Sequence, residues 1–264
     1  MRLSISNIAW PCEWDEKVYK GMKQFGFTGL EIAPTRWFKD SPYEHISEVC
    51  DIYSRLNQMY GLRISSLQSI WYGRTENIWN SPDDRESLAE YTEKAIDFAA
   101  AMRCNNLVFG CPKNRNRPEG TEENDLQIVS FFRKLGIYAE EHHTVVALEA
   151  NPLIYNTNYI NCTQEAVALI KRVASSGIRL NLDVGTIVAN GEFIEDLEGV
   201  WEYINHVHIS EPFLAMIKKR SLHRELADAL RQHGYSEYVS IEMGKQDDIE
   251  QIYETMAYIA EVFG

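Results

Sequence analysis

Four short apolar segments in the second half of the chain each end in a side chain that can bind a divalent metal ion. They read VVALEA, RLNLDVG, HVHISEP and YVSIEM, and their late polar residues are Glu149, Asp183, His208 and Glu242. Within each segment, polar and aliphatic side chains alternate, so that the polar residues occupy every second position. A strand with this pattern has one apolar face and one face with ligand-type groups near its C-terminal end. If the four strands lie side by side, three carboxylates and an imidazole converge on one point.

Such a cluster of carboxylates needs a cation. Two carboxylates about 4–5 Å apart repel by roughly 4 kcal/mol at an effective dielectric constant near 20. A divalent ion removes that repulsion and takes the imidazole as a neutral nitrogen ligand. Oxygen-rich coordination with one imidazole suits Mn²⁺, Mg²⁺ or Co²⁺; Zn²⁺ is also compatible, although no thiolate argues for it.

The alternative is that each segment is an ordinary strand with its polar face in water. Helical stretches separate the segments, however, and strands separated by helices form parallel sheets that are covered on both faces. A polar face in that setting points into an enclosed site, which favours the metal centre.

The same strand-then-helix unit continues back to the N-terminus, where RLSISN, GLEIAP, RISSLQS and NLVFG are the expected strands. Helices are expected around residues 15–25, 43–60, 83–102, 124–142, 193–203, 219–233 and 247–262, with one more starting near Thr163. Eight such units without a linker predict an α/β fold, a (β/α)₈ TIM barrel, as a single domain over residues 1–264. This barrel places its site at the C-terminal ends of the strands, where the four ligand-type residues fall.

Composition and net charge indicate which classes of protein the chain can belong to. The chain has 264 residues, 45% of them hydrophobic, and a net charge of −13, which opposes nucleic acid as a partner. From the sequence we expect neither an apolar leader nor a membrane-spanning segment. The five cysteines are scattered, which is typical of reduced thiols and predicts a soluble, cytoplasmic protein. A homo-oligomer is compatible with the sequence, and nothing in it decides the oligomeric state.

ALEANP, LNLDVGT, HVHISEP and SIEM together resemble the xylose-isomerase-like superfamily of TIM barrels, in its sugar (phosphate) isomerase/epimerase group. The resemblance covers essentially the whole length. It implies that Glu149, Asp183, His208 and Glu242 bind one divalent metal ion. It also implies an isomerase or epimerase of a keto-sugar or sugar phosphate, in which the metal stabilises an enediolate and Glu149 and Glu242 are the catalytic acid/base residues.

Three positions depart from that family. Many of its ketose epimerases carry a histidine where this chain has Thr186 and an arginine where it has Leu214. Its xylose isomerases place a lysine at the position of Asn151. The metal site is therefore supported while the usual substrate contacts are not, which predicts a different substrate.

Basic residues follow the fourth strand in the loop GCPKNRNRPEG, which carries Lys113, Arg115 and Arg117. In an acidic protein this loop is either a solvated basic segment or a clamp for a phosphate or carboxylate of the substrate. Guanidinium groups match such oxyanions with two parallel hydrogen bonds. Lys113 and Arg115 are the expected substrate-binding residues.

Further residues are placed at the barrel mouth by their strand position. Glu31 and Gln68 have the parity to face the pocket, while His206 lies one step deeper than His208 and is either a core histidine or a substrate contact. Other histidines, including His223, fall in expected helices and are predicted at the surface. Further substrate contacts and apolar walls are expected from Asn151, Glu211, Tyr155, Trp10, Trp71 and Tyr72.

Three other functions remain open. A metal-dependent dehydratase of a keto-cyclitol or sugar-like acid would use the same proton abstraction, and a non-catalytic sugar-binding barrel could keep the metal. An apurinic endonuclease resembles this barrel but uses a zinc cluster with additional histidines, whereas strands three and four here end at Gln68 and Gly110.

Overall fold

The computed structural model describes residues 1–121 and 125–264. Strands and helices alternate along the chain in this described part, in the order expected from the sequence. The strands are β1 (Arg2–Ser6), β2 (Phe27–Ile32), β3 (Arg63–Leu67), β4 (Leu107–Phe109), β5 (Val146–Glu149), β6 (Ile178–Asp183), β7 (Ile204–Ile209) and β8 (Tyr238–Ile241).

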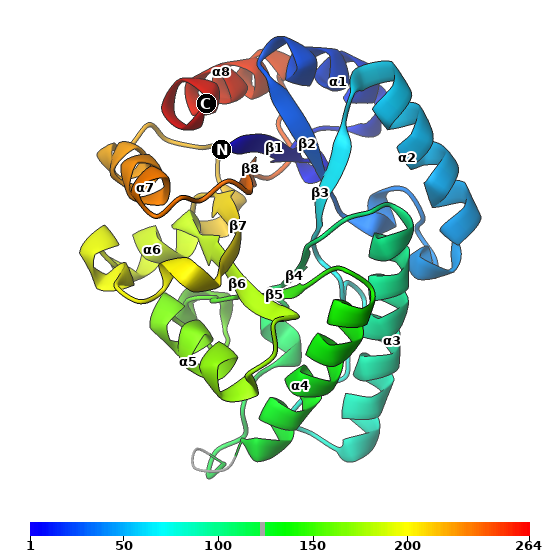
Figure 1. The fold of residues 1–264 in the computed structure, drawn as a ribbon, viewed down its shortest axis with the longest axis vertical. Helices are drawn as coiled ribbons and strands as arrows, with labels where there is room; N and C mark the ends of the chain where they lie inside the picture. The colour runs from blue at the N-terminus through cyan, green and yellow to red at the C-terminus, as the bar shows by residue number, and fades with distance from the viewer. Residues whose placement is uncertain (122–124) are drawn as a thin grey trace.

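These strands form a closed barrel in sequence order, and every neighbouring pair is parallel. The barrel closes where β1 pairs with β8. Figure 1 shows the strands at the centre and the helices in a ring around them. The predicted (β/α)₈ TIM barrel is thereby confirmed.

The outer helices are α1 (Asp15–Gln24), α2 (Ile46–Tyr60), α3 (Pro82–Ala101), α4 (Leu126–Glu141), α5 (Thr163–Val173), α6 (Val184–Asn190), α7 (Ser221–Gln232) and α8 (Ile249–Phe263). The start expected for the fourth helix, Asn124, lies outside the described residues. Most other bounds agree with the sequence to within a few residues.

The sixth helix is misplaced in the sequence-based prediction. A helix was expected over residues 193–203, but that region holds only short 3₁₀ turns in the structure, at Ile194–Leu197 and Trp201–Tyr203. Helix α6 instead follows β6 directly, because the side chain of Asp183 accepts a hydrogen bond from the backbone N of Thr186 and caps the first turn. Gly191, with φ of 67°, then ends the helix.

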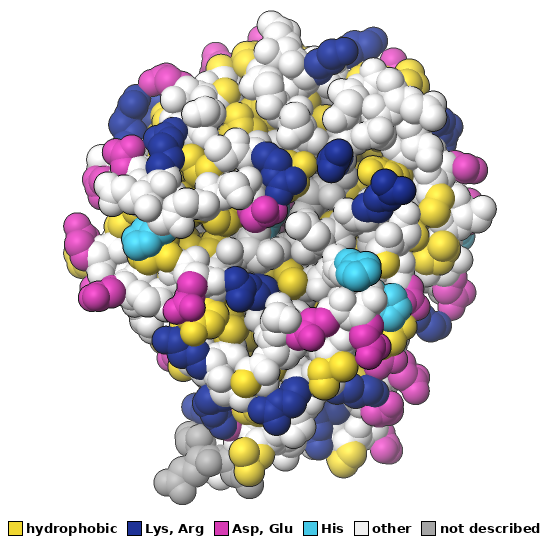
Figure 2. All heavy atoms as spheres, in the orientation of Figure 1, with side chains coloured by type: hydrophobic (Ala, Val, Ile, Leu, Met, Phe, Trp, Pro, Cys, Tyr) yellow, Lys and Arg dark blue, Asp and Glu magenta, His cyan; other side chains and the backbone are white. Residues whose placement is uncertain are grey.

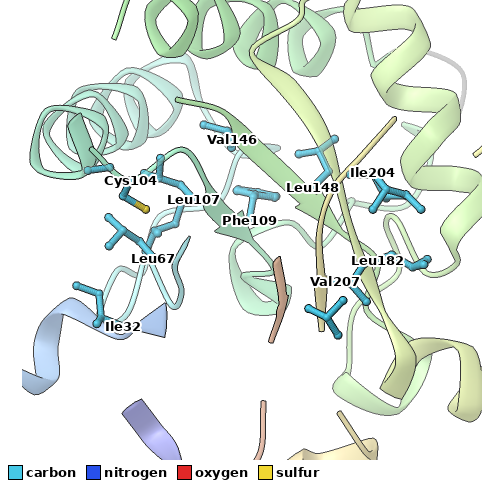
Figure 3. Packing of buried hydrophobic residues seen from close by; sticks show 14 of the residues in the cluster. Ile32, Leu67, Cys104, Leu107, Phe109, Val146, Leu148, Leu182, Ile204 and Val207 are labelled. Carbon is cyan, nitrogen blue, oxygen red and sulfur yellow. The ribbon is translucent and has the colours of Figure 1, made fainter. Parts of the chain in front are cut away.

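The two faces of the strands have different surroundings. Leu148, Leu182 and Val207 are fully buried in the layer between the barrel and its helices, and Figure 3 shows them in this packing. The alternate residues of the same strands point into the barrel. The polar residues of each strand therefore face the barrel interior, and the apolar residues face the outer layer.

The outer surface is mixed in charge. On the face drawn in Figure 2, acidic side chains are scattered among basic ones. Within the described residues, no helix combines the length and apolarity needed to cross a bilayer.

Candidate metal centre

The four residues singled out in the sequence meet at the C-terminal ends of β5 to β8. One ligand atom from each of Glu149, Asp183, His208 and Glu242 lies within 4.8 Å of the others. The barrel register produces this convergence, because Asp183 is paired with His208 and Glu149 with Asn181 on neighbouring strands. Glu242 directly follows β8.

His208 is oriented by a carboxylate from the opposite side of the barrel. Its Nε2 lies 2.9 Å from Oε2 of Glu31, on β2, so the ring donates this N–H to the carboxylate. Its Nδ1 lies 3.0 Å from Oε2 of Glu149 and 3.2 Å from Oε2 of Glu242. Nδ1 is buried and has no hydrogen-bond partner in the part of the chain that the structure describes. A histidine that donates its other ring N–H to a carboxylate in this way is typical of a metal ligand.

Asp183 is fixed by groups of its own loop and of β7. Its Oδ2 accepts hydrogen bonds from the backbone N and from Oγ1 of Thr186, at 2.8 and 2.9 Å. Its Oδ1 accepts a hydrogen bond from Ser210, whose Oγ in turn accepts from the backbone N of Gly185. The carboxylate is therefore held in one orientation before any ligand binds.

Glu149 is held by two amides. Asn181 donates to its Oε2 at 2.6 Å and Asn151 to its Oε1 at 3.1 Å. Gly110, at the end of β4, makes room for this side chain, since a Cβ there would lie 2.9 Å from Oε1 of Glu149. A side chain at Gly110 would therefore displace the carboxylate of Glu149 from this position.

Positive charge would stabilise the clustered carboxylates. Burial, together with the charge of Glu149, raises the pKa of Asp183 to about 6. Burial also raises the pKa of Glu242 to about 7. Although burial opposes a charged imidazole, the carboxylates of Glu31 and Glu242 raise the pKa of His208 well above its ordinary value. In the metal-free protein a proton on His208 therefore supplies part of the charge that a cation would supply.

A second group lies deeper in the barrel. Oε2 of Glu31 is 2.9 Å from Nε2 of both His206 and His208, and Oε1 accepts a hydrogen bond of 3.2 Å from Gln68. Burial opposes ionisation of Glu31, but the two imidazoles lower its pKa to about 2. These are hydrogen-bond distances, so this group fits the support of His208 better than a second metal.

The residues present fit a divalent cation. The unpartnered Nδ1 of His208 and the crowded carboxylate oxygens face one another. The donor set is oxygen-rich with one imidazole nitrogen, which suits Mn²⁺, Mg²⁺ or Co²⁺. Glu31 supplies the carboxylate behind the histidine that such centres commonly have.

A cavity of about 230 Å³ opens above the cluster. Glu149, Asp183 and Glu242 form its polar side, and its apolar walls include Val108, Pro112 and Leu214. Four residues predicted as substrate contacts also line it: Gln68, Asn151, Tyr155 and Glu211. A small polar molecule can thus reach the cluster from the mouth of the barrel.

The comparisons with known proteins agree with this geometry. Residues 20–262 match the family model described as xylose isomerase-like TIM barrel. The chain belongs to the xylose isomerase-like TIM barrel family. No curated protein sequence matches the chain.

Solved structures share the whole fold of this xylose isomerase-like barrel at low identity. A D-psicose 3-epimerase from Clostridium cellulolyticum H10, crystallised with D-tagatose, has a TM-score of 0.75 and 17% identity, over 100% of this chain and 99% of that chain. A 3-keto-D-glucoside 4-epimerase from E. coli has a TM-score of 0.77 and 19% identity, over 99% of both chains. An AP endonuclease of family 2 from Brucella melitensis has a TM-score of 0.74 and 18% identity, again over 99% of both chains. Such neighbours establish the fold, and the function has to be argued from the site.

Arg115 corrects the sequence-based prediction. Its side chain is fully buried and donates hydrogen bonds to the backbone O of Glu149 at 2.8 Å and of Ile160 at 3.1 Å. The guanidinium therefore holds the end of β5 in place and is not a clamp for substrate in the mouth. Lys113, two residues earlier, is exposed and lines a neighbouring groove.

Glu211 lines the cavity, and its carboxylate also accepts hydrogen bonds from Arg220 at 2.7 and 2.6 Å, which fixes the loop after β7. Two other residues are placed differently from the prediction. Trp10 is buried and donates to Asp15 instead of lining the cavity. His223, predicted at the surface, is fully buried.

The sequence reasoning missed the residues that orient the ligands. In the sequence Thr186 is visible only as a departure from the family, yet in the structure it holds Asp183 through two hydrogen bonds. Ser210 lies two positions after His208 and so faces the same side of the strand. This spacing is the sequence signal that could have predicted its contact with Asp183. For Gly110 no sequence signal identified the close approach to Glu149.

Proposed function

We propose that the protein is a divalent-metal-dependent isomerase or epimerase of a keto-sugar or sugar phosphate. The observation that carries this proposal is the convergence of Glu149, Asp183 and Glu242 on Nδ1 of His208, at the floor of a cavity of sugar size. The epimerase names of two structural neighbours support the same reaction class.

Glu149, Asp183, His208 and Glu242 would hold the ion. When bound, a divalent ion supplies Lewis acidity to a substrate carbonyl and its neighbouring hydroxyl. Asp183 is fully engaged by Thr186 and Ser210, which suits a purely structural ligand.

Glu149 and Glu242 are the acid/base pair. They line the same cavity from β5 and from the end of β8, with β6 and β7 between them. A carboxylate on one side of the substrate removes the proton from the carbon next to the carbonyl, and the carboxylic acid on the other side returns one. Return to the opposite face gives an epimer, whereas transfer by a single residue to the neighbouring carbon gives an aldose–ketose isomer. Positioned acid–base groups contribute roughly 10²–10⁴-fold to rate.

Exchange of substrate C–H for solvent deuterium tests this proposal directly. The Mn²⁺-loaded protein is incubated in D₂O with a panel of keto-sugars and their phosphates, and deuterium incorporation is followed by NMR. We expect exchange at a carbon beside the carbonyl of at least one sugar, and its loss in Glu149→Gln and Glu242→Gln. Glu225→Gln, an exposed acid on α7, is the matched control.

Three results would contradict the proposal. Exchange that persists in both glutamine variants removes these residues from the acid/base role. Absence of exchange across the panel, with sugar binding retained, indicates a binding barrel. Loss of water with the ultraviolet absorbance of an enone would assign the site to a dehydratase.

A further inference from the structure

A groove continues from the metal cavity toward the outside of the barrel. It has a volume of about 560 Å³ and is lined by the loop after β3, from Ser69 to Thr75, and by the loop after β4, from Cys111 to Asn114. Ser69, Cys111 and Pro112 line both spaces, so the groove and the cavity adjoin. Neither the metal ligands nor the acid/base pair reach the groove.

The groove is rigid because its two walls are bonded to each other. The side-chain amide of Asn114, in one loop, donates to the backbone O of Arg74 at 3.1 Å and of Glu76 at 2.8 Å, in the other. Trp71 anchors the first loop by donating to Oγ1 of Thr92, on α3, at 2.8 Å. The groove is therefore formed before any ligand binds, which lowers the cost of binding.

Two side chains in this groove are unused by the protein. Tyr72 is 72% exposed although it is a large aromatic residue. Lys113 is exposed, and its ammonium has no ion-pair partner among the described residues. Arg74 lies in the same groove, but its guanidinium is engaged by Glu76 and by Ser87. A free aromatic ring and a free ammonium group thus face the space beside the reaction site.

These features match the chemistry of a sugar ring. The C–H groups of a pyranose carry partial positive charge and pack on the negative face of an aromatic ring, and an ammonium group donates up to three hydrogen bonds to hydroxyl oxygens.

The volumes of the two spaces also fit two sugar rings. Pockets for drug-sized ligands measure roughly 300–1,000 Å³, so the cavity of about 230 Å³ suits one small sugar, and the adjoining groove has room for a second.

We propose that this groove binds a second sugar ring attached to the reacting keto-sugar, so that the substrate is a two-ring glycoside. The outer ring packs on Tyr72 and accepts hydrogen bonds from Lys113, while the inner ring occupies the cavity above the metal centre. This inference rests on the proposed function, which it extends by naming the class of substrate.

The test compares one-ring and two-ring keto-sugars by isothermal titration calorimetry on the Mn²⁺-loaded protein. The probes are D-fructose, isomaltulose and trehalulose; in the last two a glucose is joined to one end or the other of fructose. We expect at least one two-ring sugar to bind about tenfold or more tightly than fructose. Tyr72→Ala should remove most of that ratio and Lys113→Ala part of it, while Tyr72→Phe keeps it.

Matched controls lie far from the groove. Met59→Ala removes a side chain that is 63% exposed on α2, and Lys23→Ala removes an exposed lysine of α1. Both should leave the ratio of affinities unchanged.

The inference is overturned if neither two-ring sugar binds more tightly than fructose, or if the ratio survives Tyr72→Ala. Deuterium exchange into fructose is measured in parallel and decides the proposed function separately. Exchange without a preference for two rings leaves that function standing and removes the glycoside. If none of the three sugars binds, the two-ring inference is wrong, and exchange across the panel of keto-sugars and their phosphates decides the proposed function.

Discussion

The interior of the barrel and the layer outside it are built from alternate residues of the same strands, yet they have opposite chemistry. The outer layer contains fully buried aliphatic side chains such as Leu182 and Val207. The interior next to them contains Asp183 and His208, which are held by hydrogen bonds. Buried apolar area stabilises the fold, whereas buried charge costs free energy unless it is compensated. Stability therefore comes from the outer layer, and the interior is reserved for chemistry.

We expect the largest difference in Mn²⁺ affinity between substitutions of two neighbouring residues of β6. Asp183→Asn keeps the cap on α6 but removes a charged ligand, so we expect Mn²⁺ affinity to fall by more than the ~10–100-fold typical of supporting residues. Leu182→Ala should instead cost about 2–5 kcal/mol of unfolding free energy and leave Mn²⁺ affinity unchanged. Calorimetric Mn²⁺ titration and urea denaturation of both variants measure the contrast. Equal metal affinity in the two variants would contradict the division between interior and outer layer.

A supporting residue of the interior gives the next largest effect. Glu31→Gln keeps the size of the side chain but removes the charge that holds His206 and His208. We expect a loss of Mn²⁺ affinity of about 10–100-fold, measured by the same titration, with the folded structure retained by circular dichroism. Glu90→Gln, an exposed acid on α3, is the control. Unchanged affinity in Glu31→Gln would show that Glu31 does not orient His208.

Arg115 tests whether a buried charge outside the metal centre also serves stability. Arg115→Met removes a side-chain donor from the backbone O of Glu149 and one of two donors from the backbone O of Ile160, which still accepts from the backbone N of Asn151. An unsatisfied buried group costs about 1–3 kcal/mol, so we expect a loss of that size in urea denaturation. Lys113→Ala, two residues away on the surface, should change stability by less than about 0.5 kcal/mol. Similar losses in the two variants would contradict the structural role of Arg115.

The smallest effect concerns His223, a buried imidazole between α7 and α8, where it contacts Tyr258. Burial lowers the pKa of His223 to about 4, from about 6.5 when unfolded. The folded state therefore favours the neutral ring, and this stabilisation is complete above pH 6.5 and is lost as the pH falls toward 4. At pH 5 the loss is on the order of 2 kcal/mol. His223→Gln should flatten the fall in melting temperature between pH 7 and 5, and His45→Gln, at a half-exposed histidine of another part of the surface, should not.

Much of the fold was predictable because its signal is local. Alternation within each strand and the helical stretches between strands gave the barrel and the shared parity of Asp183 and His208. The sixth helix was misplaced, because a capping aspartate at the end of a strand has the same sequence appearance as a metal ligand, and here Asp183 is placed for both roles. Arg115 was misread for a similar reason, since a basic loop looks the same in sequence whether its guanidinium faces solvent or the backbone of a neighbouring strand.

The residue types at the ends of β5 to β8, and the strand face that each occupies, follow from the sequence alone, because alternation depends only on the extended backbone. Which groups those residues meet depends on how the strands close into a barrel. Glu31 contacts His208 across 177 positions of sequence, and this contact leaves Nδ1 of the imidazole facing the carboxylates. Only closure of the barrel brings β2 and β7 to a common interior, and no local pattern along the chain encodes that distance.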